Sequence, residues 1–188
     1  HAERLSALLE GSSASALSDK SQSRMHRVAS QFVRLSSETV NSDRCLDHAI
    51  SFLQSIVKRG SYIALLDEQQ SALRRVVQVF DESLWLSHLL INHQLLLDVL
   101  LDARVMGQRF HTERLSEQLS TSLAQHADDT ELTLLALNEF KISYTFKIAY
   151  HFLFQELSAS KASQLLTLLA EQILIQCNQL AKKELALQ

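Results

Sequence analysis

Apolar residues recur at helical spacing along most of this chain. In the first clear segment they follow the i, i+3, i+4, i+7, i+8 pattern of one helix face: Met25, Val28, Ala29, Phe32 and Val33. The same spacing returns from Leu46 to Val57, with Ser42 as a predicted N-cap and Gly60 as the predicted C-terminal stop. The pattern predicts two helices, each with one buried stripe.

Shorter, closely spaced helices are predicted between residues 62 and 102. Ser61 and Ser83 are predicted N-caps of two of them, because a serine side chain accepts a hydrogen bond from a free N–H group of the first turn. Nine leucines lie in residues 84–101, too many for a single stripe, so this stretch is expected to form the inner layer of the domain. After it, Thr112 is the predicted cap of a narrower helix.

The last third of the chain predicts a pair of long helices. Asp128 and Glu131 form an aspartate version of the capping box, and an uninterrupted helix is predicted from about residue 129 to about 157. A turn at 158–160 leads to a second helix over 161–186, whose apolar stripe requires a partner of similar length. The two helices are therefore expected to pack antiparallel. The predicted fold class is all-α, a multi-helix bundle of about seven to ten helices with this C-terminal pair and no β-sheet.

Composition agrees with a helical protein. The chain has 188 residues, no proline and only three glycines. Phosphate-binding loops and β-hairpin turns depend on those residue types, so both are disfavoured. Residues 1–23 are expected to form a short helix and a serine-rich linker over 11–23, followed by a single all-helical domain over 24–188. The alternative divides that domain into a short-helix part, 24–107, and a long helix bundle, 108–188.

Charge and cysteine content limit the classes of partner. The net charge is −3, and neither half of the chain has the excess of basic residues that phosphate binding needs, so no nucleic-acid partner is expected. The uncharged stretch 84–97 is too short to cross a bilayer, so no membrane contact is expected. Cys45 and Cys177 stand in apolar helix stripes as free thiols, which suits a reducing cytoplasm.

The sequence contains no residues with the spacing of a catalytic or metal site. His88 and His93 are five residues apart and fall on different helix faces, whereas Asp98 and Asp102 share a face but lack a third ligand. Neither cysteine has a basic neighbour that would favour a thiolate. We therefore predict no catalytic, cofactor-binding or metal-ligating residues.

Two further groups have both a structural and a functional interpretation. One is a basic run that contains no acidic residue: Lys20, Arg24, Arg27 and Arg34. It is interpreted as a solvated face or, alternatively, as a docking surface for an acidic partner. The other is an aromatic series: Phe140, Tyr144, Phe146, Tyr150, Phe152 and Phe154. It is interpreted as part of the hydrophobic core or, alternatively, as a cofactor-binding site.

Four phrases carry a resemblance to a known family. Arg59 to Leu66 reads RGSYIALL, and His93 to Asp102 is similar to the phrase hP-LLDeLLDp, with Gln94 in a proline position. Residues 128–149 are similar to DDEE..L..FK...LLRIA, and residues 163–174 to vSDhLT.LAE.iL. Over residues 43–186 the chain resembles the central helical region of bifunctional glutamine synthetase adenylyltransferase/adenylyl-removing enzymes.

The resemblance implies what the whole enzyme does and what this region contributes. Such an enzyme attaches AMP from ATP to a tyrosine of glutamine synthetase, removes it by phosphorolysis, requires Mg²⁺, and responds to glutamine and the PII signal protein. Its nucleotidyltransferase phrase GxLGGxELxxxSDxDL does not occur here, and the chain ends near Gln188, where that phrase is expected to begin.

This chain is therefore expected to be a non-catalytic regulatory or linker region. Its role would be to position the flanking catalytic domains of the same protein, with no cofactor of its own. The alternative is a free-standing helical adaptor that binds a partner helix in an apolar groove.

Overall fold

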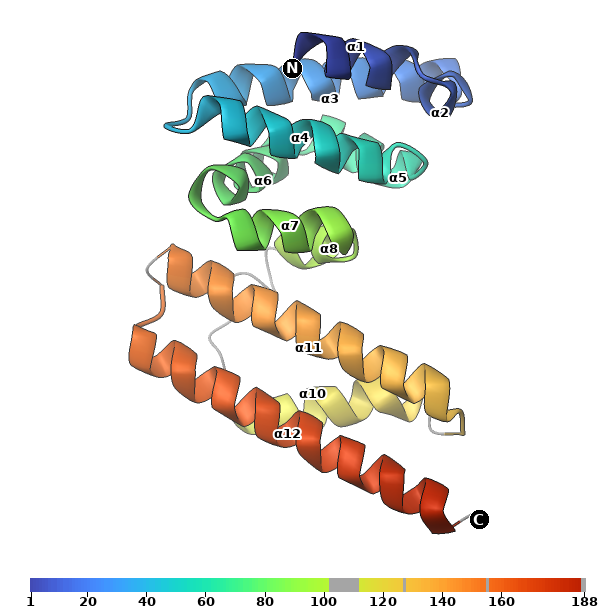
Figure 1. Cartoon of the computed structure of the whole chain (residues 1–188), viewed down its shortest axis with the longest axis vertical. Coiled ribbons are helices and arrows are strands. Elements are labelled where there is room, and N and C mark those ends of the chain that lie inside the picture. Colours follow the sequence, from blue (N-terminus) through green and yellow to red (C-terminus); the bar gives the residue numbers. More distant parts are fainter. Residues whose placement is uncertain (102–111, 127, 155, 187–188) are drawn as a thin grey trace. The chain divides into compact units, whose positions relative to one another are not determined.

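The computed structural model describes residues 1–101, 112–126, 128–154 and 156–186, and within these ranges it is all-helical without strands (Figure 1). This confirms the predicted fold class. The described helices number eleven, more than the seven to ten expected. The chain divides into two compact units, His1–Ala103 and Arg104–Gln188. The predicted domain boundaries at 23/24 and 107/108 stay predictions.

The first unit contains eight described helices, most of them short. They are α1 (Ala2–Glu10), α2 (Ser12–Ser15), α3 (Asp19–Ser37), α4 (Ser42–Ile56), α5 (Gly60–Glu68), α6 (Gln70–Glu82), α7 (Leu84–Asn92) and α8 (Leu96–Leu101). The second unit contains α10 (Thr112–Ala124), α11 (Thr130–Leu153) and α12 (Ala159–Ala186).

Three phenylalanines from three helices form the centre of the first unit. Phe32 of α3, Phe52 of α4 and Phe80 of α6 are all fully buried, and their ring centroids lie 5.8 to 6.3 Å apart. The predicted stripe of α3 is buried here except for Val33, which is 38% exposed at its edge. Aromatic rings at these separations join α3, α4 and α6 into one core.

The serine-rich segment 11–23, expected to be a linker, is helical over most of its length. Ser18 caps α3 by accepting a hydrogen bond from the Ser21 backbone N–H at 3.4 Å. The Gln22 side chain donates to the carbonyls of Ser15 and Leu17, which closes the turn between α2 and α3. Serine is favoured at helix N-caps as well as in linkers, and composition alone does not distinguish the two uses.

Several predicted helix ends lie one or more residues away from their observed positions. Ser42 is the first residue of α4 rather than its cap, and Gly60 begins α5 instead of ending α4. Ser61 consequently lies inside α5. Ser83 caps α7 as predicted, accepting a hydrogen bond from the Leu86 N–H at 3.3 Å. Many helices end at a glycine in the left-handed conformation. Gly60 does not have that conformation, so it does not act as a C-terminal stop for α4.

The leucine-rich stretch is only partly an inner layer. Its buried members are Leu86, Leu90, Leu96, Leu97 and Leu100. Leu84, Trp85 and Leu95, in contrast, are 51%, 52% and 50% exposed. Helix α7 ends at Asn92 and α8 begins at Leu96, and each of these short helices has both buried and exposed residues.

The second unit is built on the predicted antiparallel pair, α11 and α12 (Figure 1). Thr130 at the start of α11 donates a hydrogen bond to Glu184 near the end of α12. Ile148 near the end of α11 packs in one cluster with Ala162 near the start of α12. These contacts confirm the predicted pairing and its direction.

The ends of α11 differ from the prediction. Asp129, not Asp128, caps the helix by accepting from the Leu132 N–H at 3.0 Å. The third helical position is then Leu132 rather than Glu131, so no reciprocal capping box forms. The helix ends at Leu153, before the expected position of about 157.

Helix α10 completes the core of the second unit. Leu115 and Leu165 belong to one buried cluster with Leu169, and Leu119 packs in a second cluster with Leu137. The side chain of Thr112 lies outside the described residues, so its predicted role as a cap stays a prediction.

Candidate functional site

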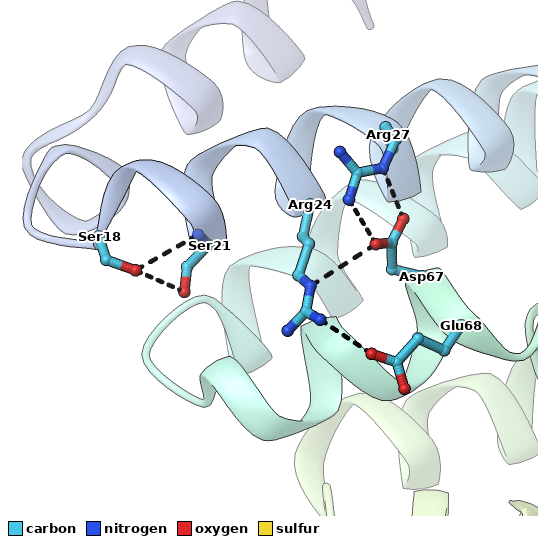
Figure 2. A network of polar contacts seen from close by, with 6 residues as sticks. All are labelled: Ser18, Ser21, Arg24, Arg27, Asp67 and Glu68. Carbon is cyan, nitrogen blue, oxygen red and sulfur yellow. Dashed lines mark hydrogen bonds and ion pairs between the residues drawn. The ribbon is translucent and has the colours of Figure 1, made fainter.

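An ion-pair network joins α3 to the last turn of α5 (Figure 2). Arg27 donates from Nε and Nη2 to the two carboxylate oxygens of Asp67, at 2.9 and 2.6 Å. Arg24 donates to Glu68 at 2.8 Å, and its Nε lies 3.7 Å from Asp67. We call these four residues the α3–α5 clamp.

Ion pairing in the α3–α5 clamp stabilises two acidic residues at the end of α5. Asp67 and Glu68 occupy the C-terminal turn of α5, where the helix dipole disfavours negative charge. The two arginines offset that effect. The hydrogen bond from Arg27 holds the pKa of Asp67 below its usual range, and Asp67 in turn raises the pKa of Arg27.

The basic run is therefore not a continuous free surface. Arg24 and Arg27 are paired in the α3–α5 clamp, and Arg34 pairs with Glu38 at 3.1 Å within α3 and its cap. The sequence predicts a solvated face or a docking surface for this run, and neither interpretation includes Asp67 and Glu68 as partners. No local signal in the sequence identifies these acids, because they stand 40 and 44 positions away from the arginines they bind.

A second polar cluster lies where α4 meets α6. The Asn41 backbone and side chain both donate to the Asp81 carboxylate, at 3.0 and 3.1 Å, and Arg44 donates to the Asp81 carbonyl. His48 is 8% exposed, and its Nδ1 has no hydrogen-bond partner in the part of the chain that is described. Burial lowers the pKa of His48, so the neutral imidazole is favoured.

The histidines and acids noted in the sequence are not brought together into a metal site. The His88 ring packs edge-on against His48, with centroids 5.6 Å apart, while His93 caps the end of α7. Asp98 accepts a hydrogen bond from the Tyr62 hydroxyl at 2.9 Å, and Asp102 lies outside the described residues. Across the described ranges, no group of three or more His, Cys, Asp or Glu side chains could hold a metal ion.

Both cysteines are free, as expected for thiols in helix stripes. Cys45 is fully buried, receives a hydrogen bond from Ser36 Oγ at 3.3 Å and donates to the Val77 carbonyl at 3.7 Å. Burial raises the pKa of its thiol, which disfavours the reactive thiolate. Cys177 is half-buried against the cluster that contains Leu119.

The aromatic series of α11 is mainly core, as predicted. Tyr144, Phe146 and Tyr150 are buried, and the Phe140 and Tyr144 rings stack at 5.6 Å. Phe152 is the exception, with 48% of its surface exposed. Rings packed among aliphatic side chains do not line a space for a cofactor.

Two exposed features remain on the second unit. A shallow, open depression on one face of α10 is lined by Arg114, Glu117, Gln118 and Thr121. Exposed apolar residues also lie along one flank of α12: Leu166, Ala170, Leu174, Ala181 and Leu185. The depression has little depth for enclosing a ligand, whereas a long apolar flank fits a protein surface.

Comparison with known proteins decides the family. The family model for glutamate-ammonia ligase adenylyltransferase matches residues 73–188, which is more than half of the chain. This chain belongs to that adenylyltransferase family. The match confirms the resemblance seen in the sequence.

Individual relatives of this adenylyltransferase family extend the match to nearly the whole chain. Bifunctional glutamine synthetase adenylyltransferase/adenylyl-removing enzymes of Xanthomonas axonopodis pv. citri and Xanthomonas campestris pv. campestris are 34% and 36% identical over 94% of the chain. The enzyme of the same description from Neisseria meningitidis is 29% identical over 92% of the chain. The chain spans only 18% to 19% of the length of these relatives.

None of the helices in the described ranges is both long enough and apolar enough to span a membrane.

Proposed function

We propose that this chain is a non-catalytic regulatory or linker region of a longer glutamine synthetase adenylyltransferase/adenylyl-removing enzyme. In that enzyme it positions the nucleotidyltransferase domains that attach AMP to glutamine synthetase and remove it. Family membership over residues 73–188 is the observation that supports the proposal, because the relatives that the chain matches are about five times its length.

Internal bracing of each unit supports a positioning role. In the first unit, the α3–α5 clamp and the phenylalanine centre tie together helices that are distant in the sequence. In the second unit, α11 and α12 pair along most of their length. A segment that sets the separation of two catalytic domains must keep its own geometry when a domain is loaded, and paired helices with a shared core do so better than single helices.

The cofactors of the proposed enzyme do not fit the described residues. Adenylyl transfer from ATP uses Mg²⁺, which prefers several oxygen ligands in an octahedral arrangement. The buried polar atoms at Arg44 and His48 are nitrogens, and Asp98 is already bonded to Tyr62. We propose that ATP and Mg²⁺ bind to other parts of the longer enzyme. We also propose that this enzyme is cytoplasmic and responds to glutamine and the PII signal protein.

The test separates positioning from chemistry in the longer enzyme. Leu169→Ala removes a buried side chain of the α11–α12 core, so it should weaken the response to effectors more than the activity of separately expressed catalytic halves. Exposed Gln179→Ala is the matched control on the same helix and should change neither. Equal losses in both assays would mean that α12 contributes directly to a catalytic site.

A second measurement uses this chain alone. With radiolabelled ATP and glutamine synthetase, the chain of 188 residues should transfer no AMP above a control without protein. ATP with Mg²⁺ should also leave its unfolding temperature unchanged, because a ligand that binds the native state stabilises it. Transfer above the control would overturn the non-catalytic assignment.

A further inference from the structure

His48 of α4 is buried in the first unit in contact with two other rings. Its ring centroid lies 5.8 Å from that of Phe80 on α6 and 5.6 Å from that of His88 on α7. The residue is only 8% exposed, and its Nδ1 has no hydrogen-bond partner in the described part of the chain. Such a site accommodates a neutral imidazole far better than an imidazolium, because burial removes the water that would solvate the charge.

The groups around His48 oppose its protonation on balance. Burial is the largest influence on the pKa of His48 and lowers it, and a hydrogen bond with the Phe80 backbone partly offsets this effect. His88 and Arg44 lower the pKa further through their positive charge, whereas Asp47 raises it. Asp47 is already paired with two basic groups of α1: Arg4 and His1. Protonated His48 would therefore be a buried cation beside another cation, near a carboxylate that other groups share.

Of the two helices whose rings contact His48, α7 is held less firmly than α6. Phe80 of α6 belongs to the phenylalanine centre of the first unit, so α6 is fixed by the core itself. Helix α7 has nine residues, and three of them are buried: Leu86, Ser87 and Leu90. The residue of α7 that contacts His48, His88, is itself exposed. Short elements with few buried side chains open at a lower free-energy cost than the core of a domain.

Protonation of His48 and opening of α7 are therefore linked. While α7 is closed, His88 covers the ring, and the neutral imidazole is favoured. When α7 moves away from α4, water hydrates the ring, which then binds a proton with the ordinary pKa of a histidine, about 6.5. Because the pKa is lower in the closed state than in the open state, a fall in pH below about 6.5 favours the open state. Well above that pH the equilibrium does not depend on His48.

We propose that His48 is a pH-sensitive latch, which holds α7 against α4 while it is neutral and releases α7 when it is protonated. Release exposes Leu86 and Leu90, which are buried in the closed state, and leaves the phenylalanine centre folded. The opening equilibrium constant of α7 should rise by up to about tenfold between pH 7.5 and pH 5.5, because the lower pH is one unit below the open-state pKa. This inference does not depend on the proposed function.

Hydrogen–deuterium exchange of the 188-residue chain tests the latch. After correction for the intrinsic effect of pH on exchange, the backbone amides of α7 should lose up to about tenfold in protection between pH 7.5 and pH 5.5. His48→Leu removes the titrating ring and should keep the protection of α7 nearly constant over that range. His26→Leu, at an exposed position of α3, is the matched control and should respond like the parent. Constant protection of α7 in the parent would overturn the proposal.

Two comparisons separate the latch from other causes of the same pH dependence. Amides of α7 should be less protected than those of α3 at both pH values, because local opening leaves the core folded. Equal protection of the two helices would mean that the first unit opens as a whole, which contradicts a latch on α7. His88→Gln removes the other titrating ring of the contact and should keep the response, because His48 still gains the proton. Loss of the response in this variant would assign it to His88 and refute the proposal.

Discussion

Arg27 and Asp67 form a bidentate ion pair in which each carboxylate oxygen accepts one hydrogen bond from the guanidinium group, at 2.9 and 2.6 Å. The pair fixes α3 against the end of α5. Its geometry distinguishes it from the Arg34–Glu38 pair, which is a single contact of 3.1 Å between half-exposed side chains four residues apart. Two parallel bonds from a planar guanidinium resist rotation and are stronger than one.

The first prediction concerns Asp67. Asp67→Asn should lower the thermal unfolding temperature more than Glu38→Gln, because an exposed i,i+4 pair such as the latter contributes only about 0.3 to 0.5 kcal/mol. The pKa of Asp67 is lowered in the folded state, so its stabilising contribution is present above the unfolded value near 3.9 and is lost as the pH falls below it. Unfolding temperatures of parent and Asp67→Asn should therefore converge below about pH 4. A constant difference from pH 7 to pH 3 would contradict this.

The second prediction concerns His48, whose pKa burial lowers. The unfolded state then binds protons more readily than the native state, so His48 makes the protein less stable as the pH falls below about 6.5. His48→Leu should reduce the fall in unfolding temperature between pH 7 and pH 5.5. His26→Leu, at an exposed position of α3, should leave that fall as in the parent. The same pH dependence in His48→Leu and in the parent would show that other groups cause it.

The third prediction concerns Gly11 and Gly60, which differ in the space available for a Cβ atom. A Cβ atom on Gly11 would lie 2.7 Å from the Ala7 carbonyl oxygen, so Gly11→Ala must displace backbone between α1 and α2 and should cost about 1 to 3 kcal/mol. Gly60→Ala is the matched control, since its Cβ would meet only Ser21 Oγ at 3.8 Å, and it should be neutral or stabilising by up to about 1 kcal/mol. Urea unfolding measures both changes. Equal stability of the two variants would contradict the close approach at Gly11.

The fourth prediction concerns the core of the second unit. Leu169 is 3% exposed and packs with Tyr144 and Ile148 of α11, so Leu169→Ala should lower the free energy of unfolding by about 2 to 5 kcal/mol. Ile175→Ala, at a 46% exposed position of the same helix, should change it by no more than about 0.5 kcal/mol. Urea titration monitored by circular dichroism gives both values. A Leu169→Ala variant as stable as the parent would show that this core does not hold α12.

The sequence by itself determined the helical class, the positions of the longest helices and the antiparallel C-terminal pair. Periodic apolar residues on α3 and α4 report the buried side of each helix, because a helix places every third and fourth residue on one face. Ser83 was identified as a cap because its bond to Leu86 spans only three residues. The family was also readable from the sequence, since its phrases keep their order and spacing in residues 43–186.

Tertiary structure alone decided which residues meet across the chain. The acids that neutralise Arg24 and Arg27 stand about 40 positions away, and no local pattern predicts that pairing. Exposure of Leu84, Trp85 and Leu95 likewise depends on how α7 and α8 pack, although the stretch is uniformly rich in leucine. Helix periodicity depends on interactions within a few residues, whereas burial and ion pairing depend on contacts made only when distant helices fold together.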